Sequence, residues 1–299
     1  MNDTLTLRND YLFKLLLGSE ENKSCLQDFL ECVLDIPSAR IEDLELLDKE
    51  LTKDTISDKT GILDVKLRLK DGTTIDIEIQ NSWSAEFIPR TLFYWAKIYL
   101  EGFKEGAAYT SLTKCITINL VSQGFKLNNQ VHSVYSILEQ QRYQHLTDLL
   151  EIHFLNLLLA SQTAMPQKPI GNQEKLINWL RFINTDDREE RAMIATTSPV
   201  LQILNEKIDV LSLTPKERKL YESRMKLKSD IATISEVQFK AGVERGLTEG
   251  KAIGLAEGEA RGSRQKALET AKLMKEENLS LDLITKITGL SQAEVAAIS

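Results

Sequence analysis

Two neighbouring segments of alternating apolar and polar residues constrain the fold of this chain more than any other feature. Residues 61–69 and 74–80 alternate with a period of two, and a polar turn separates them. The pattern predicts a β-hairpin. Both apolar rows can face one core only if the numbers of paired residues have an even sum, because a slip of one residue turns a strand over. A three-residue turn over 70–72, with Gly72 in the left-handed conformation, gives an even sum of 142.

This register places charged side chains on the other face of the hairpin. Asp64 lies opposite Glu78, with Cβ atoms about 5 Å apart, where like charges destabilise a sheet. Lys66 lies opposite Asp76 and offsets part of the repulsion. From spacing alone, the simplest interpretation is that these residues and Gln80 form the solvated face of an antiparallel hairpin. The alternative is a site for Mg²⁺, which binds one or two carboxylates together with water and substrate phosphate oxygens.

The remaining periodicity predicts an α/β fold, in which helices flank a mixed sheet, followed by an all-α C-terminal region. In the first part we expect helices at 10–34 and 85–103 and strands at 44–47, 114–121, 131–138 and 148–158. A boundary falls at 162–171, which contains two prolines. Further helices are expected at 173–183, 189–196 and 200–211, and another whose cap is formed by Thr214, Pro215 and Glu217.

Glycine recurs at every fourth position near the C-terminus. The six residues are Gly242, Gly246, Gly250, Gly254, Gly258 and Gly262. In an isolated helix they would cost roughly 6 kcal/mol relative to alanine, so this segment needs a close helix partner or is flexible. Amphipathic pieces follow at 263–277, 280–288 and 291–298, and the last two suggest a helix-turn-helix-like end. The final piece lacks Lys and Arg, so we do not expect it to read DNA sequence.

We therefore divide the chain into three predicted regions. These are an α/β domain at 1–160, a helical region at 161–240 and the glycine-periodic tail at 241–299. The tail is a candidate for self-association into a homo-oligomer, because small residues allow close approach of helix backbones.

The charge is distributed unevenly along the chain. The 44 acidic side chains outnumber the 37 basic ones, and the net charge of -7 argues against bulk electrostatic binding to nucleic acid or anionic membranes. The whole excess lies in residues 1–125, with 21 acidic and 14 basic side chains. Residues 216–228 carry six basic and two acidic side chains, and form either a phosphate contact or a solvated helix face.

Neither a structural zinc site nor a membrane span is expected. Cys25, Cys32 and Cys115 form no Cys-x-x-Cys pair, and the histidines are not spaced with them as zinc ligands. The first ten residues lack a secretory pattern, and no run approaches the roughly 18 apolar residues of a transmembrane helix. We expect a cytoplasmic protein with reduced thiols and no contact with a membrane.

The hairpin residues also belong to a wider pattern. Asp64, followed after the turn by Glu78-Ile79-Gln80, resembles the Asp…Glu-x-Gln signature of PD-(D/E)XK nuclease-like proteins of the recombination-promoting nuclease and transposase group. The similarity extends over nearly the whole chain, through Asp10-Tyr11-Leu12-Phe13-Lys14, Arg90, Tyr94, Gly106, Tyr109 and the glycine-periodic tail with Ile287-Thr288-Gly289-Leu290-Ser291.

The resemblance implies a restriction-endonuclease-like fold and metal-dependent cleavage of DNA. In this family Asp64 and Glu78 would bind Mg²⁺ or another divalent cation. Gln80 would occupy the position usually held by a catalytic lysine, without its charge. Asp10 would add a carboxylate or orient a ligand, whereas Lys14 would either pair with Asp10 or replace the missing lysine.

Two residues of the predicted helix at 85–103 complete the candidate set. Arg90 and Tyr94 share one face of that helix, where they would contact phosphate or brace the active-site sheet. The alternative is a buried structural contact with the first helix. The leading hypothesis is a Mg²⁺-dependent DNA endonuclease associated with recombination or mobile elements. The alternative is a catalytically weak or inactive nuclease fold that acts in DNA binding, assembly or defence.

Overall fold

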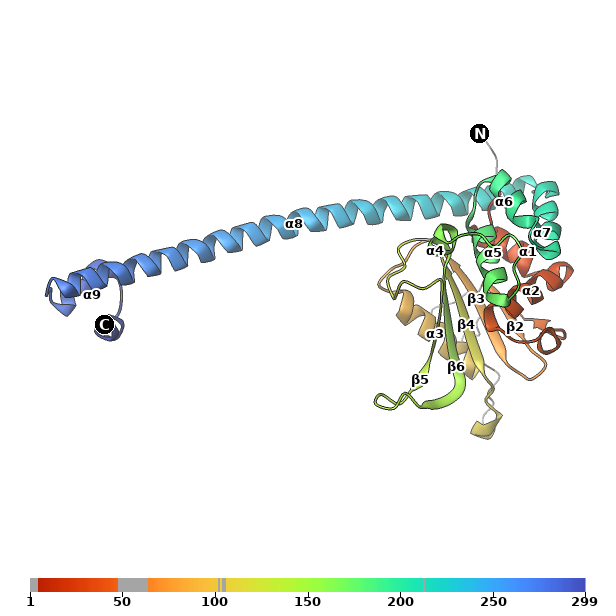
Figure 1. The fold of residues 1–299 in the computed structure, drawn as a ribbon, viewed down its shortest axis with the longest axis horizontal. Helices are drawn as coiled ribbons and strands as arrows, with labels where there is room; N and C mark the ends of the chain where they lie inside the picture. The colour runs from red at the N-terminus through yellow and green to blue at the C-terminus, as the bar shows by residue number, and fades with distance from the viewer. Residues whose placement is uncertain (1–4, 48–63, 102, 104–105, 212, 299) are drawn as a thin grey trace. The chain divides into compact units, whose positions relative to one another are not determined.

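A computed structural model describes residues 5–47, 64–101, 103, 106–211 and 213–298 (Figure 1). The first residues of the predicted hairpin, 61–63, therefore lie outside the described residues. The contacts within the chain divide it into two compact units, Met1–Ser229 and Asp230–Ser299. Each unit is described by itself.

A mixed six-stranded sheet forms the centre of the first unit. In spatial order its strands are β1 (Glu45–Leu46), β2 (Val65–Arg68), β3 (Thr74–Gln80), β4 (Cys115–Val121), β6 (His145–Asn156) and β5 (His132–Leu138). The pairs β1–β2, β2–β3 and β5–β6 are antiparallel, whereas β3–β4 and β4–β6 are parallel. The predicted mixed sheet is confirmed.

The hairpin has the predicted register and turn. Val65 pairs with Ile77, which gives the even sum required for both apolar rows to share a face. Gly72 has a φ of 87°, a conformation that glycine adopts without steric cost. Its backbone N–H donates to the carbonyl of Leu69 at 3.0 Å and closes the turn. Period-two patterning and one glycine were sufficient to predict this geometry.

Helices cover both faces of the sheet, as Figure 1 shows. The apolar face, with Ile77 and Ile118, belongs to one core together with helical residues such as Phe29 and Trp179. The elements beside this core are α1 (Asp10–Leu17), α2 (Lys23–Leu34), α4 (Leu157–Gln162), α5 (Asn172–Asn184), α6 (Arg188–Ala195) and α7 (Pro199–Val210). On the opposite face lies α3 (Phe87–Leu100), whose residue Ile98 packs against Cys115.

Helices on both sides of the predicted boundary at 160 thus contribute to one core. The three predicted regions stay predictions about independent folding. Short 3-10 helices occupy Glu20–Asn22, Ser38–Arg40 and Tyr109–Ser111. Cys25, Cys32 and Cys115 are free and buried.

Helix α8 (Pro215–Glu276) begins at the predicted cap. The hydroxyl of Thr214 accepts from the backbone N–H of Glu217, whose carboxylate accepts from the N–H of Thr214 in return. The helix continues through all six glycines of the four-residue repeat, and apart from adjacent residues and the helix's own backbone no atom among the described residues lies within 4 Å of the position a Cβ would take at any of them. Within the described chain the repeat has no close helix partner, and its self-association stays a prediction.

In the second unit, α9 (Leu281–Thr288) and α10 (Gln292–Ala297) fold back on the end of α8. Their small core consists of Ala271, Ile284, Leu290 and Val295. Ser291 and Glu294 form a reciprocal capping box at the start of α10. The predicted pair of short helices is confirmed. Across the described residues, no helix combines the length and the apolar composition that a membrane crossing requires.

Candidate functional site

The charged face of the hairpin is buried. Four side chains on it are less than a tenth exposed: Asp64, Lys66, Asp76 and Glu78. The interpretation of this face as solvated is wrong, because helix α3 packs over it. The indole N–H of Trp95 in α3 donates to the backbone carbonyl of Cys115 in β4 at 3.0 Å, which ties the helix to the sheet. Burial makes these charges costly unless they are paired or bind a ligand.

Asp64 is the centre of the site. Its backbone N–H donates to Oε1 of Glu78 at 3.0 Å, and its Oδ2 accepts from the backbone N–H of Ile79 at 2.8 Å. The predicted proximity of Asp64 and Glu78 is confirmed. The second oxygen of Asp64, Oδ1, lies 2.8 Å from Nζ of Lys14. The site therefore joins the hairpin to helix α1.

The start of α1 positions this lysine. The side-chain oxygen of Asn9 accepts from the backbone N–H groups of Tyr11 and Leu12 and caps the helix. Lys14 follows one turn later, with a side chain only 20% exposed. The sequence predicts that Lys14 pairs with Asp10 or replaces the missing lysine; in the structure its ammonium pairs with Asp64, the proposed metal ligand.

The pKa of each of the three carboxyl groups on this face is raised above its ordinary value. Burial raises the pKa of Asp64 despite the opposing ammonium of Lys14. Burial raises the pKa of Glu78 well above its ordinary value, and the negative charges of Asp76 and Asp64 raise it further. The same two causes, burial and the charge of Asp64, raise the pKa of Asp76. Such a cluster has a strong electrostatic affinity for positive charge.

Asp76 is the candidate residue that the sequence interpretation missed. Its side chain is 1% exposed, and neither carboxylate oxygen has a hydrogen-bond partner among the described residues. Lys66 lies opposite in the register, as predicted, but its ammonium group forms an ion pair with Glu101 after the end of α3. The alternation already placed Asp76 on the same face as Glu78, and only its burial distinguishes it from an ordinary surface residue.

The other predicted residues surround this cluster. Asp10 lies in the first turn of α1, and its charge raises the pKa of Asp64. Gln80 ends β3, half-buried, two residues beyond Glu78. On α3, burial raises the pKa of Tyr94 and the charge of Glu78 adds to the shift, so the phenol lies within electrostatic range of the carboxylates.

Arg90 makes its contact within α3. Its guanidinium lies over the ring of Phe87 in the same helix, 5.4 Å from the ring centroid. Its charge lowers the pKa of Tyr94, so it contributes positive potential on this side of the site. Its predicted roles toward phosphate and toward the sheet stay predictions.

The donor set suits a hard divalent cation that keeps water and substrate ligands. In the part of the chain that the structure describes, no group of three or more His, Cys, Asp or Glu side chains is arranged as a metal cage. Asp64 and Glu78 supply two carboxylates on neighbouring strands, joined by the hydrogen bond from the backbone N–H of Asp64 to Glu78, and the buried carboxylate of Asp76 adds negative potential. One or two carboxylates completed by water and phosphate oxygens is the coordination typical of Mg²⁺.

A comparison with protein families agrees with this geometry. Residues 7–237 match the model for the PD-(D/E)XK nuclease family transposases. The chain belongs to this family. The matched range contains α1, the hairpin and α3, and therefore every candidate residue named above. No curated protein and no solved structure gives a significant match.

Proposed function

We propose that this member of the nuclease family is a divalent-cation-dependent DNA endonuclease that hydrolyses phosphodiester bonds in the cytoplasm, in recombination or in the movement of genetic elements. The observation that supports it best is the buried contact between Asp64 and Glu78, both aimed from the hairpin into a face covered by α3. Two carboxylates held without solvent gain most from a cation that also binds phosphate.

Asp64 and Glu78 are the residues that would hold the cation. When bound, Mg²⁺ or a similar ion would activate water and offset the charge that develops on the transferred phosphate. The hydrogen bond from the N–H of Asp64 to Glu78 and the one from the N–H of Ile79 to Asp64 fix both carboxylates before substrate arrives. This rigidity reduces the reorganisation that the reaction requires.

Lys14 supplies the positive charge that Gln80 lacks. Without substrate its ammonium neutralises Oδ1 of Asp64. With a cation on that carboxylate, the same ammonium can donate to a phosphate oxygen, because lysine carries three donors on a flexible stem. Gln80 keeps a neutral donor and acceptor at the end of β3, suited to orienting water or substrate.

Tyr94, Arg90 and Asp10 act around this centre. The phenol of Tyr94 lies within electrostatic range of Glu78 and can donate to a phosphate oxygen. The guanidinium of Arg90 adds a second positive charge on the same helix face. Asp10 holds negative charge near Asp64 and so strengthens cation binding. The basic stretch at 216–228 is a further candidate for contact with the DNA backbone.

Cleavage of plasmid DNA tests this proposal. The full chain is incubated with supercoiled plasmid in Mg²⁺ and in EDTA, beside Asp64→Ala and Glu78→Ala. Each substitution is expected to reduce the Mg²⁺-dependent rate by roughly 100-fold or more, because a metal ligand is lost. Asp148→Ala is the matched control, since that carboxylate is 91% exposed. Cleavage that survives both site substitutions would exclude this site.

A further inference from the structure

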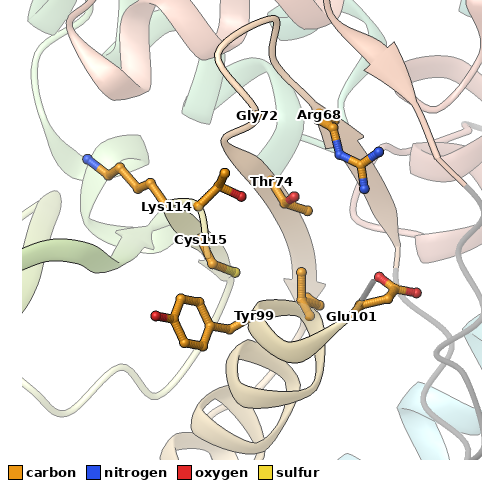
Figure 2. A pocket seen from close by; sticks show the side chains of 9 residues that line it. Arg68, Gly72, Thr74, Tyr99, Glu101, Lys114 and Cys115 are labelled. Carbon is orange, nitrogen blue, oxygen red and sulfur yellow. The ribbon is translucent and has the colours of Figure 1, made fainter. Parts of the chain in front are cut away.

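A cavity of about 310 Å³ lies on the same sheet face as the carboxylates (Figure 2). The strands β2, β3 and β4 and the end of α3 form its walls. Thr74 and Cys115 line it and pair with each other in the register, two residues before Asp76 on β3. Two residues along a strand span about 7 Å, so Thr74 in the cavity wall lies about this distance from Asp76 of the carboxylate cluster.

Electrostatic contacts connect the cavity to the cluster. Glu101 lines the cavity, and its carboxylate pairs with the buried ammonium of Lys66, which lies opposite Asp76. Burial raises the pKa of the Cys115 thiol, and the charge of Asp76 is the next largest cause. A ligand in the cavity would therefore adjoin whatever is bound by the carboxylates.

Arg68 is the cation that the cavity offers to a ligand. Its guanidinium lines the cavity and forms no ion pair with the residues that the structure describes. Lys114 also lines it, but its ammonium pairs with Glu151, and Figure 2 shows the side chain extending away from Arg68. The negative charge of Glu101 is offset by Lys66. The cavity therefore offers a ligand one uncompensated positive charge, the forked guanidinium of Arg68.

Two hydroxyl groups accompany this guanidinium. Thr74 and Thr113 both line the cavity, and neither hydroxyl has a hydrogen-bond partner within the described chain. Gly72 closes the wall beside Thr113, where a Cβ would approach the methyl group of Thr113 to 3.0 Å. A guanidinium with neighbouring hydroxyls is a donor set that matches phosphate oxygens.

We propose that this cavity binds a backbone phosphate near the scissile one in the DNA strand, with Arg68 as its main contact. The inference rests on the proposed function, which places the scissile phosphate at Asp64 and Glu78. Thr74 lies four residues before Glu78 on β3, a span of about 13 Å, which is comparable with the separation of phosphates two nucleotides apart in one nucleic-acid strand. Arg68 is thus a substrate-positioning residue, since it contacts DNA away from the reacting atoms.

Equilibrium binding of a fluorescently labelled DNA duplex to the full chain tests the inference. Anisotropy is measured in Ca²⁺ over a series of salt concentrations, with the DNA confirmed intact on a gel. Arg68→Ala is expected to weaken binding roughly five- to tenfold and to lower the slope of log affinity against log salt by about one, because one phosphate contact is lost. Arg68→Lys keeps the charge and is expected to retain most of that slope.

Arg40→Ala is the matched control. It removes the same charge from an exposed arginine that pairs with Asp71 in the hairpin turn, and Arg40 does not line the cavity. We expect its affinity to stay within about twofold of the wild type. Thermal melts establish that each variant is folded.

The outcomes separate this inference from the proposed hydrolysis. If no protein cleaves DNA but Arg68→Ala still weakens binding relative to Arg40→Ala, the hydrolysis fails and the phosphate contact stands. If the wild type cleaves and the two variants bind equally, the phosphate contact is refuted. A thermal-shift assay with inorganic phosphate or a mononucleotide then distinguishes a free anion from the DNA backbone as the occupant of the cavity. A stabilisation that depends on Arg68 without any change in DNA affinity would assign the cavity to a free anion and overturn the proposal.

Discussion

Asp76→Asn is expected to stabilise the protein at neutral pH when divalent cations are removed. The carboxylate of Asp76 is 1% exposed and has no hydrogen-bond partner among the described residues, and the negative charge of Asp64 lies nearby. Asparagine has nearly the same shape and carries no charge. The substitution therefore removes an electrostatic cost and leaves the packing of α3 over the sheet intact.

The sign and size follow from proton linkage. Burial raises the pKa of Asp76 in the folded protein well above its ordinary value of 3.8, so the folded chain binds more protons than the unfolded chain. Stability is then lost as the pH rises from the unfolded pKa to the folded one, at up to about 1.4 kcal/mol per pH unit. Asparagine carries no charge and avoids this loss, so its advantage is about 1.4 kcal/mol for each pH unit passed between the two pKa values. With about 2–4 °C for each kcal/mol in a domain of this size, the variant should melt several degrees higher.

Thermal and urea unfolding of the wild type, Asp76→Asn and Asp148→Asn measure this effect in EDTA, between about pH 5 and about pH 8. The advantage of Asp76→Asn should grow as the pH rises, whereas the exposed control should stay within about 0.5 kcal/mol of the wild type. Added Mg²⁺ should reduce the advantage, because the cation stabilises the charged cluster. A variant less stable than the wild type at the highest pH, or a difference independent of pH, would refute the reasoning.

Three further substitutions probe the site and the backbone. Lys14→Met leaves the buried Asp64 without its counter-ion, so it should lower the free energy of unfolding by about 3 kcal/mol at neutral pH, by less in acid where Asp64 is protonated, and should slow cleavage. Urea unfolding measures the loss of stability and a plasmid assay measures the cleavage rate. An equal loss of stability at every pH would contradict the ion-pair account. Gly72→Ala should lower the stability of the fold by roughly 1–2 kcal/mol because φ is 87°, whereas Gly250→Ala in the open part of α8 should raise helix stability by about 1 kcal/mol. Circular dichroism melts compare the two variants. Changes of the same sign would be inconsistent with the two backbone conformations.

Local pattern was sufficient wherever the determining interactions are close in sequence. Period-two alternation and Gly72 predicted the hairpin and its register, and the register predicted that Asp64 and Glu78 meet. The cap at Thr214 and the capping box at Ser291 also lie within one helical turn. These features depend on backbone geometry over a few residues, which composition and spacing determine directly.

Only the tertiary structure decided what the polar face of the hairpin does. Alternation of polar and apolar residues looks the same whether the polar face meets water or a helix, and the packing of α3 over that face is a contact between distant segments. The ion pairs of Lys14 with Asp64 and of Lys66 with Glu101 join residues 50 and 35 positions apart in the numbering. Such contacts depend on how whole elements pack, and through them a row of ordinary charged residues becomes a buried carboxylate site beside a cavity of about 310 Å³.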